Sequence, residues 1–152
     1  AGLVGHAQAL SRSLAAELAL FELKRGTQMS VKGAATLTAN ILGGRPHWVQ
    51  LLIAGVDEEG SHVYSIDSAG GSIPDVYCAT GSGSPYMYGV LEDKFREGMN
   101  RDEAVEVVAR ALLASAQRDA ASGNGMDVCV ITAKDGYQLI PQEELEALFK
   151  RL

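Results

Sequence analysis

The most informative stretch of this sequence is Arg118-Asp119-Ala120-Ala121-Ser122-Gly123-Asn124-Gly125-Met126-Asp127. A long amphipathic, helix-like pattern leads into it, and an apolar, strand-like run leaves it. An acid, a hydroxyl and two glycines so close together exceed what the end of a helix requires. The stretch therefore predicts a polar turn that holds side chains in fixed positions. Its expected counterpart is Gly81-Ser82-Gly83-Ser84, a second polar turn between a strand and a helix.

Hydrophobic periodicity and cap residues predict helices and antiparallel strands around these two turns. Ser30 is an expected N-cap, and Asn100 with Glu103 predicts a capping box. The helices are expected near residues 6–24, 31–42, 84–95, 101–118 and 142–151, and the strands near 48–56, 62–66, 76–80, 126–132 and 137–140. The order α-α-β-β-β-α-α-β-β-α is typical of an α+β fold with helices layered on antiparallel sheet.

Two of these segments carry a further expectation about burial. The nearly continuous apolar run 48–56 predicts a strand that is covered on both faces. In the fourth helix the expected buried stripe is Ala104, Val105, Val108, Leu112 and Ala116.

Composition narrows the class of protein. The chain has 152 residues, 47% of them hydrophobic and 21% charged, as in a single globular domain. The net charge of −6 argues against nucleic acid and anionic membrane as partners, and no apolar run is long enough for a membrane span. Cys78 and Cys129 are expected to be reduced core thiols of a cytoplasmic protein. The histidines are scattered, so neither a metal site nor a cofactor is predicted.

Six short motifs follow one another along the whole chain: Ala1-Gly2-Leu3-Val4-Gly5 before a helix, Val49-Gln50-Leu51-Leu52-Ile53-Ala54-Gly55-Val56-Asp57, Tyr64-Ser65-Ile66-Asp67, Ala79-Thr80-Gly81-Ser82-Gly83-Ser84, Tyr88-Gly89-Val90-Leu91-Glu92 and Arg118-Asp119-Ala120-Ala121-Ser122-Gly123-Asn124-Gly125. In this order they resemble the β subunit of the 20S proteasome, most closely the archaeal type. The resemblance implies an N-terminal nucleophile hydrolase, whose fold is a four-layer αββα sandwich. It implies one β-type domain over residues 1–152.

The sequence departs from the family at its start. Family members carry further residues before the Ala-Gly motif, with the first sheet strands and the N-terminal Thr nucleophile. We therefore expect a domain that is incomplete at its N-terminus, with its first strands missing, and a chain that is inert alone. Thr27, Thr36 and Thr38 are internal, so they cannot supply the free α-amine that this chemistry uses as a base.

The resemblance assigns roles to six residues of this sequence. Ser82, Asp119 and Ser122 match the polar residues that hydrogen-bond the Thr amine and hydroxyl. Gly2 matches the glycine whose backbone N–H forms the oxyanion hole. Val4 matches a wall of the substrate side-chain pocket, and Asp67 matches an acid that faces the substrate groove of a neighbouring subunit. Four of them also have a structural alternative: Ser82 can cap the third helix, Asp119 can be a solvated acid, Ser122 can be a turn hydroxyl, and Gly2 can provide loop flexibility.

The predicted function is that of a β subunit in the ATP-independent core particle of regulated intracellular protein degradation. The complete protein would be a threonine endopeptidase, acting on unfolded polypeptide. Its implied partners are other β subunits in a seven-membered ring, a proteasome α-subunit ring, and an ATP-dependent unfoldase that acts through the α ring. Three alternatives stay open: a naturally inactive structural β-type subunit, a related peptidase with six-membered rings, and a non-enzymatic α+β binding module.

Overall fold

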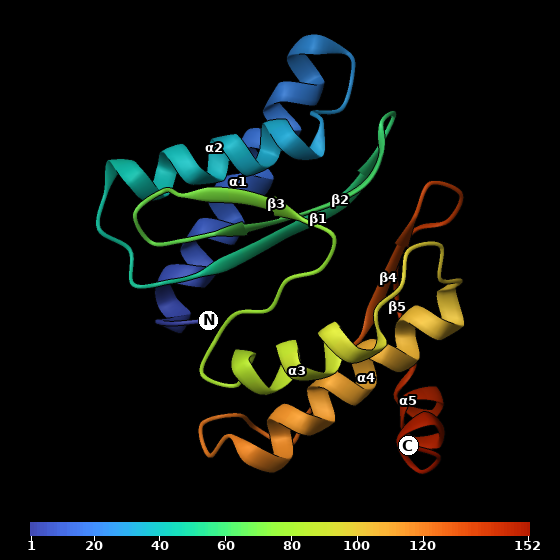
Figure 1. Cartoon of the computed structure of the whole chain (residues 1–152). Coiled ribbons are helices and arrows are strands. Elements are labelled where there is room, and N and C mark those ends of the chain that lie inside the picture. Colours follow the sequence, from blue (N-terminus) through green and yellow to red (C-terminus); the bar gives the residue numbers. More distant parts are fainter. The chain divides into compact units, whose positions relative to one another are not determined.

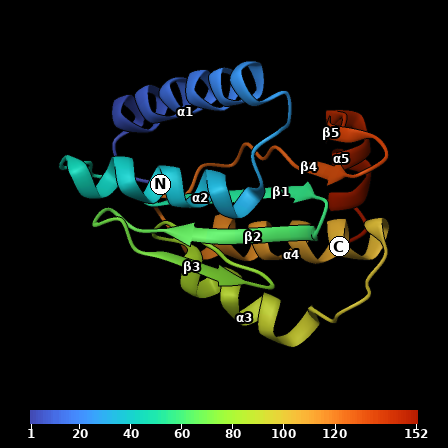
Figure 2. The ribbon, with the colours of Figure 1, turned by 90° about the horizontal axis from the view of Figure 1, so that it is seen from above.

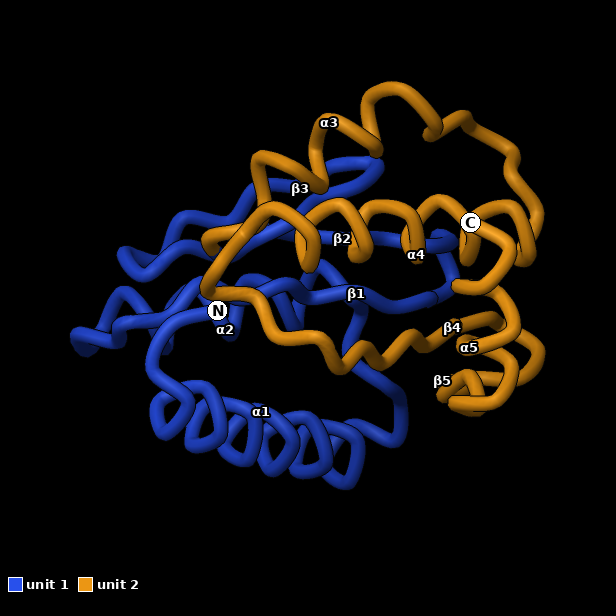
Figure 3. The backbone as a smooth tube through the Cα atoms, turned by 90° about the horizontal axis from the view of Figure 1, so that it is seen from below, with its two compact units in different colours: residues 1–81 blue, residues 82–152 orange.

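The computed structural model describes all residues from 1 to 152, in two compact units, Ala1–Gly81 and Ser82–Leu152 (Figure 3). The predicted order of helices and strands is confirmed. The elements are α1 (Val4–Arg25), α2 (Val31–Gly44), β1 (Leu51–Asp57), β2 (Gly60–Ile66), β3 (Ser72–Asp75), α3 (Ser84–Lys94), α4 (Arg101–Arg118), β4 (Cys129–Thr132), β5 (Gly136–Leu139) and α5 (Gln142–Phe149) (Figure 1). The chain is thus a mixed, α+β protein. None of its helices is both long and apolar enough to cross a membrane.

Unit 1 packs two antiparallel helices with a three-stranded antiparallel sheet in the order β1-β2-β3 (Figure 2). The core includes Leu10 of α1 and the small and apolar side chains of α2, which are Val31, Ala35, Ala39 and Leu42. Val49, together with Tyr64 and Ile66 of β2, completes it. The cross-strand partners of Tyr64 and Ile66 are Ile53 and Leu51. One face of the sheet therefore supplies the side chains that meet the helices.

The other face of β1 corrects a prediction. Leu52 is 40% exposed and Ala54 is also exposed, so β1 is not covered on both faces as expected. Trp48, which the prediction placed inside the strand, precedes it and is exposed. An apolar run alone does not show which neighbours cover a strand, because leucine and alanine predict burial from their residue type even where the structure leaves them exposed.

The third strand was predicted in the wrong place. Residues 76–80 form no strand, and β3 is Ser72–Asp75 instead. The turn at Asp67 is tight, since the Asp67 N–H donates to the Gly71 carbonyl at 3.0 Å, so pairing resumes at once between Ile66 and Ser72. Pro74 argues against a strand in the sequence, but β3 is an edge strand, where a residue without an N–H is tolerated.

Unit 2 consists of the packed pair α3 and α4, the β4-β5 hairpin and α5. Its core contains Val105, Val128, Ile140 and Leu145. The capping box of Asn100 and Glu103 at the start of α4 is confirmed. The predicted stripe of α4 is only partly right, because Ala104 and Val108 are exposed. Val105 is buried as predicted, and the helix also buries Val107, Ala109, Ala111 and Ser115, so its buried residues spread over more than one face.

The cysteines are free, as predicted, but they are not two core thiols in strands. Cys78 lies outside any strand and is partly buried, and this burial raises the pKa of its thiol. Cys129 begins β4 with an exposed side chain. The apolar residues next to Cys129 made it look buried, although successive residues of a strand point to opposite faces.

A carboxylate connects α2 to the β1-β2 hairpin. Asp57 Oδ2 accepts the N–H of Val31 at 2.8 Å, and Asp57 Oδ1 accepts the N–H of Glu59 at 2.9 Å. The hydrogen bond from Val31 is the main reason that the pKa of Asp57 lies below its ordinary value, and His62 Nε2, 3.2 Å away, acts in the same direction. Ser30 caps the same helix by accepting the Gly33 N–H at 3.1 Å, as predicted. Asp57 therefore adds a second, charged cap to α2.

This cap predicts a pH dependence of stability. Because the native pKa of Asp57 is below the unfolded value of about 3.9, its contribution is complete above that pH and is lost as pH falls through the native pKa. We expect Asp57→Asn to lower the melting temperature at pH 7, and the difference from wild type to shrink below about pH 4. Thermal denaturation at several pH values measures this. The exposed neighbour Glu58 supplies the control, because Glu58→Gln is expected to leave the melting temperature unchanged.

Candidate functional site

The predicted polar turn after α4 is organised by the side chain of Asp119. This residue is the C-cap of α4, and its N–H donates to the Ser115 carbonyl at 2.8 Å. Its own carbonyl accepts the N–H of Ser122 at 3.2 Å, and its Oδ1 accepts the N–H of Ala121 at 3.3 Å. These bonds bring Ser122 back to the carboxylate, where the Ser122 hydroxyl donates to Asp119 Oδ2 at 2.7 Å.

The second predicted turn supplies Ser82 to the same carboxylate. The Ser82 hydroxyl donates to Asp119 Oδ2 at 2.6 Å. Because α3 and α4 run antiparallel, the start of α3 lies beside the end of α4 (Figure 1). The N-cap of α3 is Gly83, without a side-chain cap, so Ser82 does not cap this helix. The structure thus brings together Ser82, Asp119 and Ser122, three residues that the sequence placed in one site.

The electrostatics of this site favour an ionised carboxylate. The hydrogen bond from Ser82, followed by that from Ser122, holds the pKa of Asp119 below its ordinary value. An ionised carboxylate only accepts hydrogen bonds, so both hydroxyls must donate to it. Their oxygen lone pairs then remain to accept hydrogen bonds from an incoming N–H or O–H. The site presents negative charge and hydrogen-bond acceptors, and it is suited to hold an amine or a hydroxyl.

Two further residues, Ser115 and Gly83, belong to this site, although the sequence predicted no role for either of them. The Ser115 hydroxyl lies 3.0 Å from the Ser122 hydroxyl and is buried within α4. Gly83 packs against both, since a Cβ at Gly83 would overlap Ser115 Oγ and lie 3.0 Å from Ser122 Oγ. The signal for Ser115 was a single hydroxyl in the run Ala111-Leu112-Leu113-Ala114-Ser115-Ala116, four residues before Asp119 and hence on the same helical face.

Gly2 lies in unit 1, in a bridge to Val49. The Leu3 N–H donates to the Trp48 carbonyl and the Gln50 N–H donates to the Ala1 carbonyl, at 2.8 and 2.9 Å. In this antiparallel pattern Gly2 is the residue between the two bonds, so its own N–H points away from the partner strand. Its φ of 112° and its contact with the Trp48 carbonyl, which a Cβ would overlap, both require glycine.

Val4 and Asp67 are the other predicted site residues of unit 1. Val4 is the first residue of α1 and is 69% exposed. Asp67 is exposed, but its Oδ1 accepts the N–H groups of Ala69 and Gly71 at 2.9 and 2.8 Å. The carboxylate of Asp67 therefore stabilises the β2-β3 turn, a structural role that the sequence did not predict.

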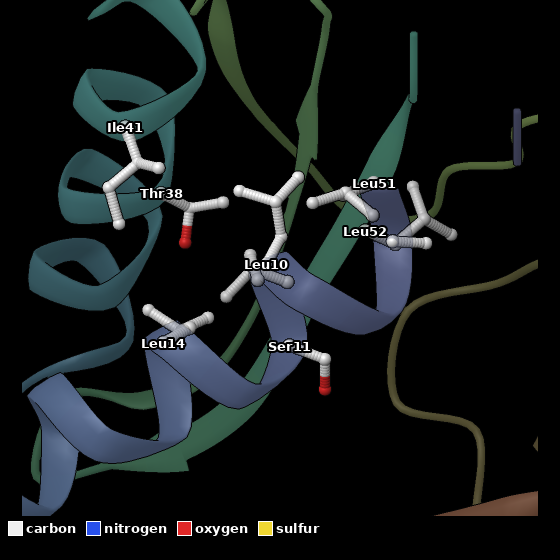
Figure 4. Close-up of a pocket in the computed structure, with 9 residues that line it drawn as sticks. Leu10, Ser11, Leu14, Thr38, Ile41, Leu51 and Leu52 are labelled. Carbon is white, nitrogen blue, oxygen red and sulfur yellow. The ribbon is translucent and has the colours of Figure 1, made fainter. Parts of the chain in front are cut away.

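An apolar cavity of about 160 Å³ lies elsewhere in unit 1 and contains none of the predicted site residues. Leu10 and Leu14 of α1 face Thr38 and Ile41 of α2, and Leu51 closes one side (Figure 4). The lining holds no ionisable side chain, so the cavity offers nothing for acid–base chemistry. No group of three or more histidine, cysteine or acidic side chains is arranged to hold a metal ion.

The histidines have structural partners. His6 Nδ1 accepts the N–H of Trp48 at 3.2 Å, next to the bridge of Gly2. The imidazole of His62 faces Asp57, as described above, and His47 Nδ1 lies 2.8 Å from the Arg45 carbonyl oxygen. Each histidine thus contacts a backbone group or a carboxylate of unit 1.

Comparison with known proteins identifies the family. The family model described as "Proteasome subunit" matches residues 1–131. The whole chain is 50% identical to a protein named proteasome subunit beta from Thermoplasma acidophilum, over 73% of that protein. It is 45% identical to the protein of the same name from Methanobrevibacter ruminantium and 47% identical to that from Methanohalophilus mahii, covering 73% and 74% of them. The chain belongs to the proteasome subunit family, as a β-type subunit of a 20S core particle of the archaeal type.

Proposed function

We propose that this chain is part of a threonine endopeptidase, in which Ser82, Asp119 and Ser122 support an N-terminal threonine. The observation that carries the proposal is the shared acceptor: Asp119 Oδ2 accepts hydrogen bonds from the hydroxyls of Ser82 and Ser122, at 2.6 and 2.7 Å. A negative, acceptor-rich site of this kind stabilises an ammonium group and orients a neighbouring hydroxyl. Asp119 thus stabilises the α-amine when it takes the proton of the threonine hydroxyl, and the serines fix the geometry.

The nucleophile belongs, in this proposal, to residues outside the 152 described. The threonines of this chain are internal, so they offer no free α-amine. The hydroxyls of Thr36 and Thr38 donate to helix carbonyls at 2.9 and 2.7 Å, and that of Thr80 donates to Gln50. The relatives are longer than this chain, which covers 73% of the Thermoplasma protein. The 152 residues alone would then be inert.

The reaction would proceed through a covalent intermediate. The threonine oxygen attacks the peptide carbonyl, the amine carries the proton to the leaving nitrogen, and water then hydrolyses the acyl-enzyme. The orientation of the Gly2 N–H supports an oxyanion role, because this N–H points away from the partner strand in the bridge to Val49 and is free to bind a substrate oxygen. Val4 would form an apolar wall for the substrate side chain, and Asp67 would face the groove of a neighbouring subunit while it stabilises its own turn.

The assembled architecture is part of the same proposal. The domain, residues 1–152 with additional N-terminal strands, would form a four-layer αββα sandwich. The exposed Leu52 and Ala54 on β1 support it, because a second sheet packed on that face would bury them. Seven such subunits would form a ring stacked on an α ring in the cytoplasm. Unfolded polypeptide would be delivered by an ATP-dependent unfoldase through the α ring.

Co-expression of the full-length gene product with an α-type subunit tests this function. We expect rings with seven subunits in negative-stain top views, hydrolysis of fluorogenic peptides, and a mature N-terminal threonine in protein sequencing. Assembled rings that cleave no peptide would establish the inactive structural subunit instead. Six subunits per ring would place the protein with the related six-membered peptidases.

A further inference from the structure

We propose that Ser115 is a positioning residue for the peptidase reaction, because its hydroxyl fixes the orientation of the Ser122 hydroxyl. The proposal rests on the function proposed above for Asp119 and Ser122. Ser115 lies in the last turn of α4, the helix whose C-cap is Asp119. Its hydroxyl is 3.0 Å from that of Ser122, which in turn donates to Asp119.

The direction of these hydrogen bonds follows from counting protons. Ser122 has one hydroxyl proton, and it donates this proton in a hydrogen bond of 2.7 Å to the carboxylate of Asp119. In the 3.0 Å contact between the two serines, Ser115 must therefore be the donor. A serine oxygen has two lone pairs, and Ser115 occupies one of them. One lone pair of Ser122 remains, so an incoming amine or hydroxyl can be accepted along a single direction.

The surroundings of Ser115 show that its position is built into the fold. Its side chain is almost fully buried, with the residue 5% exposed. The Ser115 carbonyl accepts the N–H of Asp119 at 2.8 Å, so the backbone of Ser115 holds Asp119 while its side chain holds Ser122. Gly83 leaves room for this arrangement, because any larger residue would overlap the Ser115 hydroxyl. Ser115 and Gly83 thus pack together against the side chain of Ser122.

The kinetics of the assembled, full-length particle test this role. Ser115→Ala is expected to lower kcat about five- to tenfold while KM changes less than twofold, because a hydrogen bond that orients the catalytic groups is lost and substrate contacts are not. The matched control is Thr38→Val, which removes another buried hydroxyl that bonds within its own helix. This control is expected to leave both constants unchanged.

Gly83→Ala provides an independent second variant. A Cβ there displaces the Ser115 hydroxyl without deleting it, so kcat is expected to fall in the same way. When Gly83→Ala and Ser115→Ala are combined, the fall in kcat is expected to be smaller than the product of the two separate effects. The reason is that both substitutions remove the same hydrogen bond, between Ser115 and Ser122.

The outcomes separate this inference from the proposed function. If kcat of Ser115→Ala stays within twofold of wild type while Asp119→Asn is inactive, the role of Ser115 is refuted and the function stands. If Asp119→Asn is itself fully active, the proposed function fails. Should Ser115→Ala not assemble, Ser115→Cys keeps the core filled with a weaker donor, and an unchanged kcat in that variant overturns the inference.

Discussion

Asp119→Asn in the full-length, assembled particle is expected to lower kcat for peptide hydrolysis by about 10²- to 10⁴-fold, with little change in KM. The substitution removes the negative charge that would stabilise a protonated α-amine. It also replaces one carboxylate oxygen by an NH₂ group. In the wild type the Ala121 N–H donates to Asp119 Oδ1. If the amide oxygen of the substituted side chain points towards Ser82 and Ser122, its NH₂ group faces this N–H instead. Donor then meets donor, and that hydrogen bond is lost. In the opposite orientation the Ala121 N–H keeps its acceptor, but the NH₂ group donates to the two serine oxygens and so reverses both hydrogen bonds.

Steady-state kinetics with a fluorogenic peptide, at pH values from 5 to 9, measure this effect. Asp135→Asn is the matched control, because it makes the same chemical change on an exposed acid in the turn between β4 and β5. Assembly is checked by size-exclusion chromatography, so that a loss of rings is not mistaken for a loss of chemistry. An Asp119→Asn particle that assembles and keeps kcat within threefold of wild type would contradict the role of this carboxylate.

The site could be predicted as far as its residues belong to local motifs. Asp119 and Ser122 stand three residues apart, and a carboxylate that closes its own turn brings such a pair together. Ser82 was assigned to them by resemblance, since 37 residues separate it from Asp119. Ser115 escaped prediction because a serine within a helix is usually a solvated or back-bonded hydroxyl, and only the packing of Gly83 distinguishes it.

The fold followed the same division between local and long-range signals. Caps and helix positions were predictable because Ser30 and Asn100 bond backbone groups within three residues. The place of β3 was not, because it depends on how tightly the turn at Asp67 closes. The exposed face of β1 and the buried faces of α4 depend on which elements cover them, and a hydrophobic pattern does not contain that information.

Gly2→Ala is expected to destabilise unit 1 by about 3 kcal/mol, since strain at an unfavourable φ and overlap in a packed region each cost about 1–3 kcal/mol. The backbone at Gly2 has a φ of 112°, which a residue with a Cβ rarely adopts. The added Cβ would overlap the carbonyl of Trp48, the acceptor of the Leu3 N–H. Relief of this overlap would break the bridge to Val49 and move the start of α1.

The same displacement would move the N–H proposed for the oxyanion hole, so Gly2→Ala couples stability to activity. Thermal denaturation of the full-length subunit is expected to show a melting temperature about 6–12 °C below wild type. Gly5→Ala is the matched control: this glycine lies in α1 with open space around its Cβ position, and alanine there is expected to be neutral or to stabilise by up to about 1 kcal/mol. A Gly2→Ala subunit that melts within 2 °C of Gly5→Ala would refute the strain at this position. A Gly2→Ala subunit that is destabilised as expected but retains full kcat would refute the oxyanion role, because the displaced backbone would have moved the N–H from where the bridge places it.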